Sequence, residues 1–139
     1  MPLSPDEQRN RYLGSPPRAW ITLRLATPAG KTRAWKLVAD TGNPFAFVIS
    51  KEAMHEYSFG AATHVQTNFG VLEGAWFRLS MAEFGLDVLA LGYASEAVVS
   101  SVKTSHLDFE GLAGLPLLRL LEYGGDSEDF WIRSRASPA

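Results

Sequence analysis

One aspartate, Asp40, stands between two short apolar segments of the chain. Residues 37–39 precede it, and residues 45–49 form a continuous apolar run soon after it. Runs of this length are typical of strands that are covered on both faces. A carboxylate between two such strands is costly unless hydrogen bonds or a neighbouring group hold its charge. The placement of Asp40 therefore predicts a β-rich core in which this acid has a use.

The rest of the chain also consists of strand-length segments separated by turns. Apolar alternation and β-forming residues predict strands at residues 20–25, 33–39, 45–49, 63–69, 75–80, 86–93, 97–102 and 130–132. A short helix is expected over residues 51–57, capped by Ser50. A second helix of about two turns is expected to begin at Pro116 and to stop at Gly124 and Gly125. The sequence thus predicts a mainly β fold with one or two short helices.

The chain has 139 residues, a length that accommodates one ordinary domain. Residues 1–18 are polar and contain Pro2, Pro5, Pro16 and Pro17, so we expect an arm or linker outside the core. The domain itself is expected over residues 19–133, followed by a tail at residues 134–139.

Composition excludes several classes of function. The 13 Lys and Arg against 15 Asp and Glu give a net charge of −2, which offers no excess of cations for nucleic acid. Cysteine is absent, and His55, His64 and His106 have no metal-ligand spacing, so we expect no metal and no cofactor. Neither a secretory signal nor an apolar run of membrane length is present, which predicts a soluble, cytoplasmic protein without a membrane partner.

A second motif lies downstream of Asp40. It consists of Gly111, two apolar residues, Gly114 and the start of the expected helix at residues 115–118. An apolar strand ending in Asp40-Thr41-Gly42, followed later by such a segment, resembles the retropepsin-like aspartic proteases. The resemblance covers roughly residues 19–133 and depends on these two short segments.

The resemblance implies a closed β-barrel of the retroviral aspartic protease type that works as a two-fold homodimer. Only one Asp-Thr-Gly occurs in the chain, so each protomer would contribute one aspartate. The implied activity is that of an aspartic endopeptidase, in which two Asp40 carboxylates share one proton and activate a water. Thr41 would lock the two loops together, and Gly42 would allow the tight turn.

The resemblance also assigns a peptide-binding surface. Residues 65–79 look like a flap hairpin whose tip, residues 69–74 with Gly70 and Gly74, closes over an extended peptide or unfolded protein. Residues 130–132 look like a dimer-forming terminal strand. At the tip, Glu73 either prefers basic substrate side chains or lies in a solvated loop. The residues expected to contact substrate are Asn43, Phe69, Gly70, Val71, Leu72, Glu73, Gly74, Leu112, Ala113 and Gly114.

Asn43 departs from the family pattern, which usually has Ala or Ser at this position. Its amide is expected either to donate a hydrogen bond to the Asp40 carboxylate or to crowd the site. Two alternatives to a peptidase follow. One is a catalytically inactive peptide-binding or dimerisation module with the same fold and dimer. The other is an unrelated small β-barrel binding protein, in which Asp40 lies far from any symmetry mate.

Overall fold

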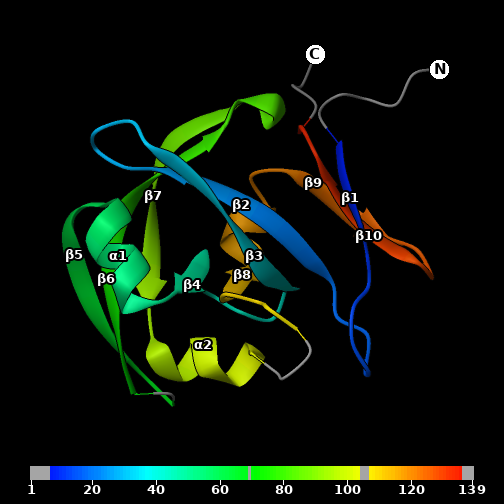
Figure 1. The fold of residues 1–139 in the computed structure, drawn as a ribbon, viewed down its shortest axis with the longest axis horizontal. Coiled ribbons are helices and arrows are strands. Elements are labelled where there is room, and N and C mark those ends of the chain that lie inside the picture. Colours follow the sequence, from blue (N-terminus) through cyan, green and yellow to red (C-terminus); the bar gives the residue numbers. More distant parts are fainter. Residues whose placement is uncertain (1–6, 69, 104–106, 136–139) are drawn as a thin grey trace.

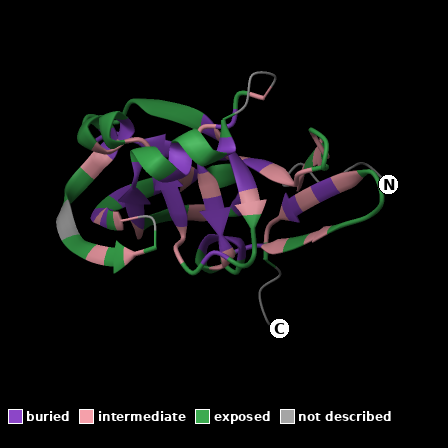
Figure 2. Ribbon diagram, turned by 90° about the horizontal axis from the view of Figure 1, so that it is seen from below, coloured by how far each residue is buried: buried purple, intermediate pink, exposed green. Residues whose placement is uncertain are grey.

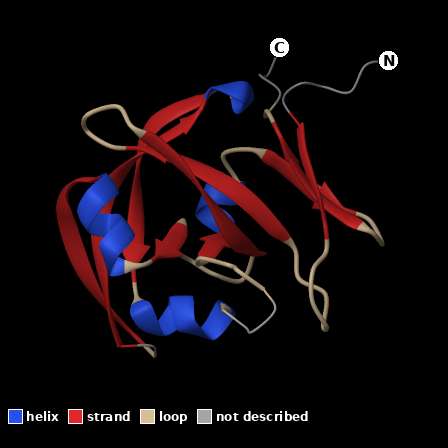
Figure 3. Cartoon of the chain, viewed as in Figure 1, coloured by secondary structure: helices blue, strands red, loops and turns tan. Residues whose placement is uncertain are grey.

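The computed structural model describes residues 7–68, 70–103 and 107–135, and the side chains of residues 61 and 62 are outside this description. Strands dominate, and the helices lie around them (Figure 3). The helices are α1 (Lys51–Tyr57), α2 (Glu96–Val102) and α3 (Leu115–Leu118), with a 3-10 helix η1 (Ala82–Phe84). The strands are β1 (Glu7–Arg11), β2 (Trp20–Ala26), β3 (Thr32–Asp40), β4 (Phe47–Ile49), β5 (Ser58–Thr67), β6 (Gly70–Met81), β7 (Leu86–Ala94), β8 (Leu112–Gly114), β9 (Glu122–Gly125) and β10 (Asp129–Arg133).

Six strands form a closed barrel. Their order is β2-β3-β8-β4-β7-β6, and β6 closes the ring by pairing Leu79 with Leu25 of β2. Strand β5 lies outside the ring and extends it through its hairpin with β6 (Figure 1). The predictions of a mainly β fold and of a closed barrel are confirmed.

The core fills the interior of this barrel. Along β2 the side chains alternate, and Ile21, Leu23 and Leu25 are fully buried, as the sequence predicts. Phe47 of β4 and Phe77 of β6 are also fully buried, with ring centroids 5.1 Å apart in an edge-on arrangement. Figure 2 shows the buried residues concentrated on the strands of the barrel. Burial of the apolar face of each strand is therefore what holds the ring closed.

The helix at residues 51–57 is confirmed, and its Ser50 accepts a hydrogen bond from Ala53 N at 3.1 Å. Residues 97–102, predicted as a strand, form α2 instead. Ser95 caps α2 by accepting from Val98 N at 3.2 Å, and the helix buries Val98 and Val102 on one face. The prediction was wrong because the valines of this segment have high β-propensity, whereas their spacing of four residues matches a helical face.

The second predicted helix is shorter than expected. The helix α3 spans only Leu115–Leu118, a single turn, and buries Leu117 and Leu118. Gly124 and Gly125, predicted to stop the helix, belong to strand β9. Gly124 lies under the indole of Trp131, where a Cβ atom would come within 2.5 Å of the ring. Close packing on a neighbouring strand thus explains this glycine, and helix termination does not.

A separate three-stranded sheet, β1-β10-β9, lies beside the barrel (Figure 1). The expectation of an arm over residues 1–18 is wrong for residues 7–11, because they form β1. Gln8 accepts from Thr22 N at 2.6 Å and donates to Thr22 O at 3.2 Å, and Asn10 donates to Trp20 O at 3.1 Å. These amides satisfy the free edge of β2 as a neighbouring strand would. A strand that uses polar side chains in this way has no apolar alternation to detect.

Strand β10 is the central strand of this sheet. Its backbone pairs with β1 on one side and with β9 on the other, both within the same chain. Phe130 and Ile132 are buried in the protomer's own core. The strand at residues 130–132 is therefore confirmed, but its backbone is fully occupied, and the expected role as a strand that pairs across a dimer is not supported. No helix within the described ranges has both the length and the apolar character needed to cross a membrane.

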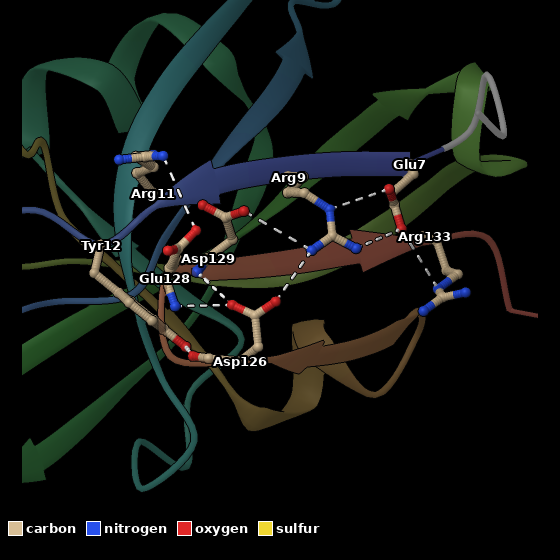
Figure 4. Close-up of polar contacts among 8 residues, drawn as sticks. All are labelled: Glu7, Arg9, Arg11, Tyr12, Asp126, Glu128, Asp129 and Arg133. Atoms are coloured by element: carbon tan, nitrogen blue, oxygen red, sulfur yellow. Dashed lines mark hydrogen bonds and ion pairs between the residues drawn. The ribbon is translucent and has the colours of Figure 1, made fainter. Parts of the chain in front are cut away.

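The turn between β9 and β10 is closed by Asp126 (Figure 4). Its carboxylate accepts hydrogen bonds from the backbone N–H groups of Glu128 and Asp129, each at 2.8 Å, and Arg9 lies 3.7 Å away. These hydrogen bonds lower the pKa of Asp126 below its usual value. The N–H of Asp129 has the largest effect, the N–H of Glu128 comes next, and the charge of Arg9 adds to the lowering.

This lowered pKa predicts an acid-sensitive contribution to stability. A carboxylate whose folded pKa lies below its unfolded pKa stabilises the fold fully above about pH 4, and the contribution disappears as the pH falls through the folded pKa. Asp126→Asn keeps an oxygen acceptor but removes the charge, so its Tm should fall less steeply between about pH 5 and pH 2 than that of the wild type. Asp126→Ala, which loses the acceptor as well, should also lower Tm at neutral pH. Parallel Tm curves for wild type and Asp126→Asn would contradict this account.

Candidate active site

Asp40 is the last residue of β3, beside the strand that carries the downstream motif. Strand β8 runs parallel to β3 and pairs Ala39 with Ala113 and Asp40 with Gly114. The other edge of β8 pairs antiparallel with β4, so β8 lies between the two strands that flank the loop at residues 41–46. The structure thus brings together the two motifs that the sequence singled out, which lie far apart along the chain.

The loop after β3 keeps the acid at the surface. Asp40, Thr41 and Gly42 are all exposed. Gly42 N–H donates to Asp40 Oδ1 at 2.9 Å, and Asn43 N–H donates to the backbone oxygen of Asp40 at 3.1 Å. A carboxylate in this position is solvated and held by one backbone donor. The cost of burial that the sequence suggested does not arise within the single chain.

Asn43 is buried and holds the loop in shape. Its Oδ1 accepts from Phe45 N at 2.9 Å, and its backbone oxygen accepts from Leu115 N at 3.1 Å, which ties the loop to the start of α3. Among the described residues, Asn43 makes no hydrogen bond to the Asp40 carboxylate. The expectation that this amide donates to Asp40 is therefore wrong, because the Asn43 side chain binds the backbone of Phe45 within the loop instead.

Gly114 allows β8 to approach the loop closely. A Cβ atom at this position would lie 1.9 Å from the backbone oxygen of Phe45 and 2.7 Å from that of Asn43. Gly114 N–H donates to Ala46 O at 2.9 Å, so the backbones are in direct contact. Ala113, next to it, is fully buried in the core. These contacts fix the position of the loop that carries Asp40.

The hairpin predicted as a flap is present, but its tip is displaced from the predicted position. Thr67 pairs with Gly70, so residues 70–74 belong to strand β6 and do not form the tip. Phe69 lies outside the described residues. Leu72 is buried in a cluster with Val48 and Val98. Val71, whose side chain would point to the opposite face of the strand, is 53% exposed.

The same cluster links the hairpin to the neighbourhood of Asp40. Phe45 and Leu112 pack against it, the first in the loop after Asp40 and the second in β8. Leu112 pairs with Val38, two residues before Asp40. Five of the residues predicted to contact substrate therefore lie in the loop after Asp40, in β8 or in the apolar cluster that contacts both: Asn43, Leu72, Leu112, Ala113 and Gly114.

Glu73 lies apart from this group. Its carboxylate is 3.9 Å from Lys51 Nζ, at the start of α1. It also lines a shallow groove with His55 and His64, on the side of the hairpin that faces α1. Glu73 is therefore a strand residue in an exposed ion pair, and the expectation that it stands at the tip and recognises basic substrate side chains is not supported.

A groove of about 450 Å³ opens beside Asp40. Val38 and Leu112 supply the wall that continues from Asp40, and α2 supplies Val102. Arg18 also lines the groove. The sequence did not predict this groove, because residues 1–18 were expected in an arm and residues 97–102 in a strand. For Arg18 no local sequence signal exists, since its proximity to Asp40 arises from the tertiary structure.

No family model, curated protein or solved structure matches the chain. Within the part of the chain that the structure describes, no cluster of three or more His, Asp or Glu residues has the arrangement of a metal site. The fold and the site define a six-stranded barrel with one exposed aspartate in a tightly braced loop beside a groove. A carboxylate so placed is equipped to exchange protons with a molecule bound in that groove.

Proposed function

We propose that the chain is an aspartic endopeptidase of the retropepsin-like type, which hydrolyses extended peptides as a homodimer. The observation that carries this proposal is the exposed Asp40 at the end of β3, in a loop braced by Gly114 of the parallel neighbouring strand. The groove beside Asp40 gives a peptide a place to lie.

The dimer follows from the need for two carboxylates. The chain contains a single Asp-Thr-Gly, and this segment is exposed together with Pro44, so it is open to a second copy. A two-fold axis beside Asp40 brings two identical acids together through an isologous contact. In that contact the Thr41 hydroxyl binds the partner loop, and Gly42 permits close approach of the two backbones.

The reaction uses the pair as acid and base. Two carboxylates in contact cannot both be ionised, so the pair of Asp40 side chains holds one proton. The ionised carboxylate takes a proton from a water, whose oxygen attacks the carbonyl carbon of the peptide, while the protonated carboxylate gives its proton to the carbonyl oxygen. The tetrahedral diol then collapses: its C–N bond breaks, the amine leaves with the proton that the pair holds, and one hydroxyl of the diol returns a proton to the other carboxylate, so the pair again holds one proton. A segment that closes over the bound peptide would exclude water from the reacting groups, and the hairpin β5–β6 is the candidate for this role that the family resemblance assigns.

The proposal is tested by incubating the protein with a reduced, unfolded protein over a range of enzyme concentrations and identifying products by mass spectrometry. We expect internal cleavage, with a bell-shaped pH profile because activity needs one ionised and one protonated carboxylate. Activity per protomer should fall when the enzyme is diluted below the dissociation constant of the dimer. A pepstatin-like peptide, with a hydroxyl in place of the scissile carbonyl, should raise Tm, since a ligand at 100 times its Kd stabilises by about 2.7 kcal/mol.

Two outcomes would contradict the proposal. Saturable peptide binding without cleavage at any pH would favour the non-catalytic peptide-binding module. Cleavage whose rate per protomer is independent of dilution, by a protein that sediments as a monomer, would show that one Asp40 suffices and would exclude the shared-proton mechanism.

A further inference from the structure

Among the residues that the structure describes, Arg18 is the one cationic side chain that lines the groove beside Asp40. Its backbone is held in a tight loop, because Arg18 N–H donates to Leu13 O at 2.7 Å and Leu13 N–H donates to Arg18 O at 3.1 Å. The residue is half-buried. The main chain of Arg18 is therefore held in a defined place, and its side chain lines the groove beside the acid proposed to act on the peptide.

The charge of Arg18 has no partner within the described ranges. Its side chain forms no ion pair and no hydrogen bond there, whereas Arg33 pairs with Glu110 and Arg78 pairs with both carboxylate oxygens of Asp87. Of the described residues that line this groove, Asp40 is the other charged one, and it forms no ion pair with Arg18.

The other residues that line the groove offer few groups that could bind the Arg18 guanidinium in place of a ligand. Val38, Val102 and Leu112 are apolar, and Ser101 is the only neutral polar side chain among the described residues that line the groove. A cation beside apolar walls interacts more strongly with an incoming anion than a fully solvated cation does. The planar guanidinium is also shaped to bind both oxygens of a carboxylate.

We propose that Arg18 selects peptides that carry an acidic side chain close to the bond that is cleaved. The inference rests on the proposed function for the presence of a peptide in this groove. The two charges of the groove give it polarity: Asp40 repels a substrate carboxylate, and Arg18 attracts it. An Asp or Glu side chain is thus directed to the Arg18 wall, which fixes the register of the peptide relative to the reacting groups.

The experiment starts from one peptide that the enzyme cleaves and that has neutral side chains around the scissile bond. A set of variants of this peptide places a single Gln at each flanking position in turn. Each Gln peptide is compared with its Glu counterpart by kcat/KM. We expect the wild type to prefer Glu about fivefold at one position, the ratio given by a half-exposed ion pair. Arg18→Ala should bring this ratio to about one, and Arg18→Glu should favour Lys over Glu at the same position. Arg11→Ala is the matched control, because Arg11 is 80% exposed on β1 and does not line the groove.

A binding measurement separates this inference from the proposed function. Fluorescence anisotropy measures how the same peptides bind to the Asp40→Asn variant and to the double variant that also carries Arg18→Ala. Cleavage with no preference for Glu, or a preference that survives Arg18→Ala, overturns the inference and leaves the peptidase. Binding that favours Glu through Arg18, without any cleavage by the wild type, supports the recognition of acidic side chains by Arg18 and overturns both the peptidase and the placement of that side chain beside a cleaved bond. Neither binding nor cleavage of any peptide overturns both.

Discussion

Asparagine in place of Asp40 is expected to lower peptide hydrolysis by at least about 10³-fold, because the pair then has no ionised carboxylate to take the proton from water. The fold should be retained. Asn is isosteric with Asp, and its Oδ1 can still accept the hydrogen bond from Gly42 N–H, which is 2.9 Å long in the structure. Since Asp40 is exposed, the substitution leaves no buried group without a partner.

The measurement is the initial rate of cleavage of a peptide with a fluorophore and a quencher, together with sedimentation and circular dichroism of the same samples. Asp87→Asn is a suitable control. It removes one negative charge from an exposed aspartate that pairs with Arg78 and does not line the groove. An Asp40→Asn protein that is folded and dimeric but cleaves at the rate of the wild type would refute the catalytic role of Asp40.

Gly114→Ala is expected to destabilise the fold by at least about 3 kcal/mol, at the upper end of the range for overpacking. The added Cβ would lie 1.9 Å from the backbone oxygen of Phe45. Relief requires a backbone shift, because the atom in the way is a main-chain carbonyl and not the end of a flexible side chain. Strand β8 pairs with β3 on one side and with β4 on the other, so it cannot move without breaking both ladders.

Urea unfolding, followed by tryptophan fluorescence, measures this loss as a change in the free energy of unfolding. Gly30→Ala serves as the control: a Cβ there meets nothing within 4 Å, although its φ of +93° adds strain of roughly 1–2 kcal/mol. If Gly114→Ala costs no more than Gly30→Ala, the close approach of β8 to the loop is not what holds Asp40 in place.

Apolar alternation was enough to predict most barrel strands, and an interior strand such as β4 was found from its continuous apolar run. Apolar alternation failed where helix packing or side-chain hydrogen bonds decide the conformation. Valines at residues 98, 99 and 102 gave α2 the composition of a strand, and packing of one helical face overrode their propensity. Strand β1 was missed because Gln8 and Asn10 contribute hydrogen bonds to β2 where apolar contact is usual.

The sequence predicted the two motifs of the candidate site separately, and the structure shows that they are adjacent. Asp40 and Gly114 were both singled out, and they are paired residues of parallel strands. The predicted tip of the hairpin is wrong because Gly70 and Gly74, which suggest a turn in the sequence, lie within β6. Arg18 was not predicted at all, since its distance from Asp40 along the chain carries no information about the groove that they share.

The insertion of β8 between β3 and β4 has a consequence for the biosynthesis of the protein. A ribosome releases residues 32–49 well before residues 112–114, so the acid loop is exposed to the cell without the segment that shapes it. Contacts between segments so distant in sequence require both segments to be present, and the entropy of closing the long intervening loop slows folding. A chain that has not yet reached residues 112–114 therefore lacks the strand that shapes the acid loop, so the hydrolytic activity proposed above would require these residues to have been made.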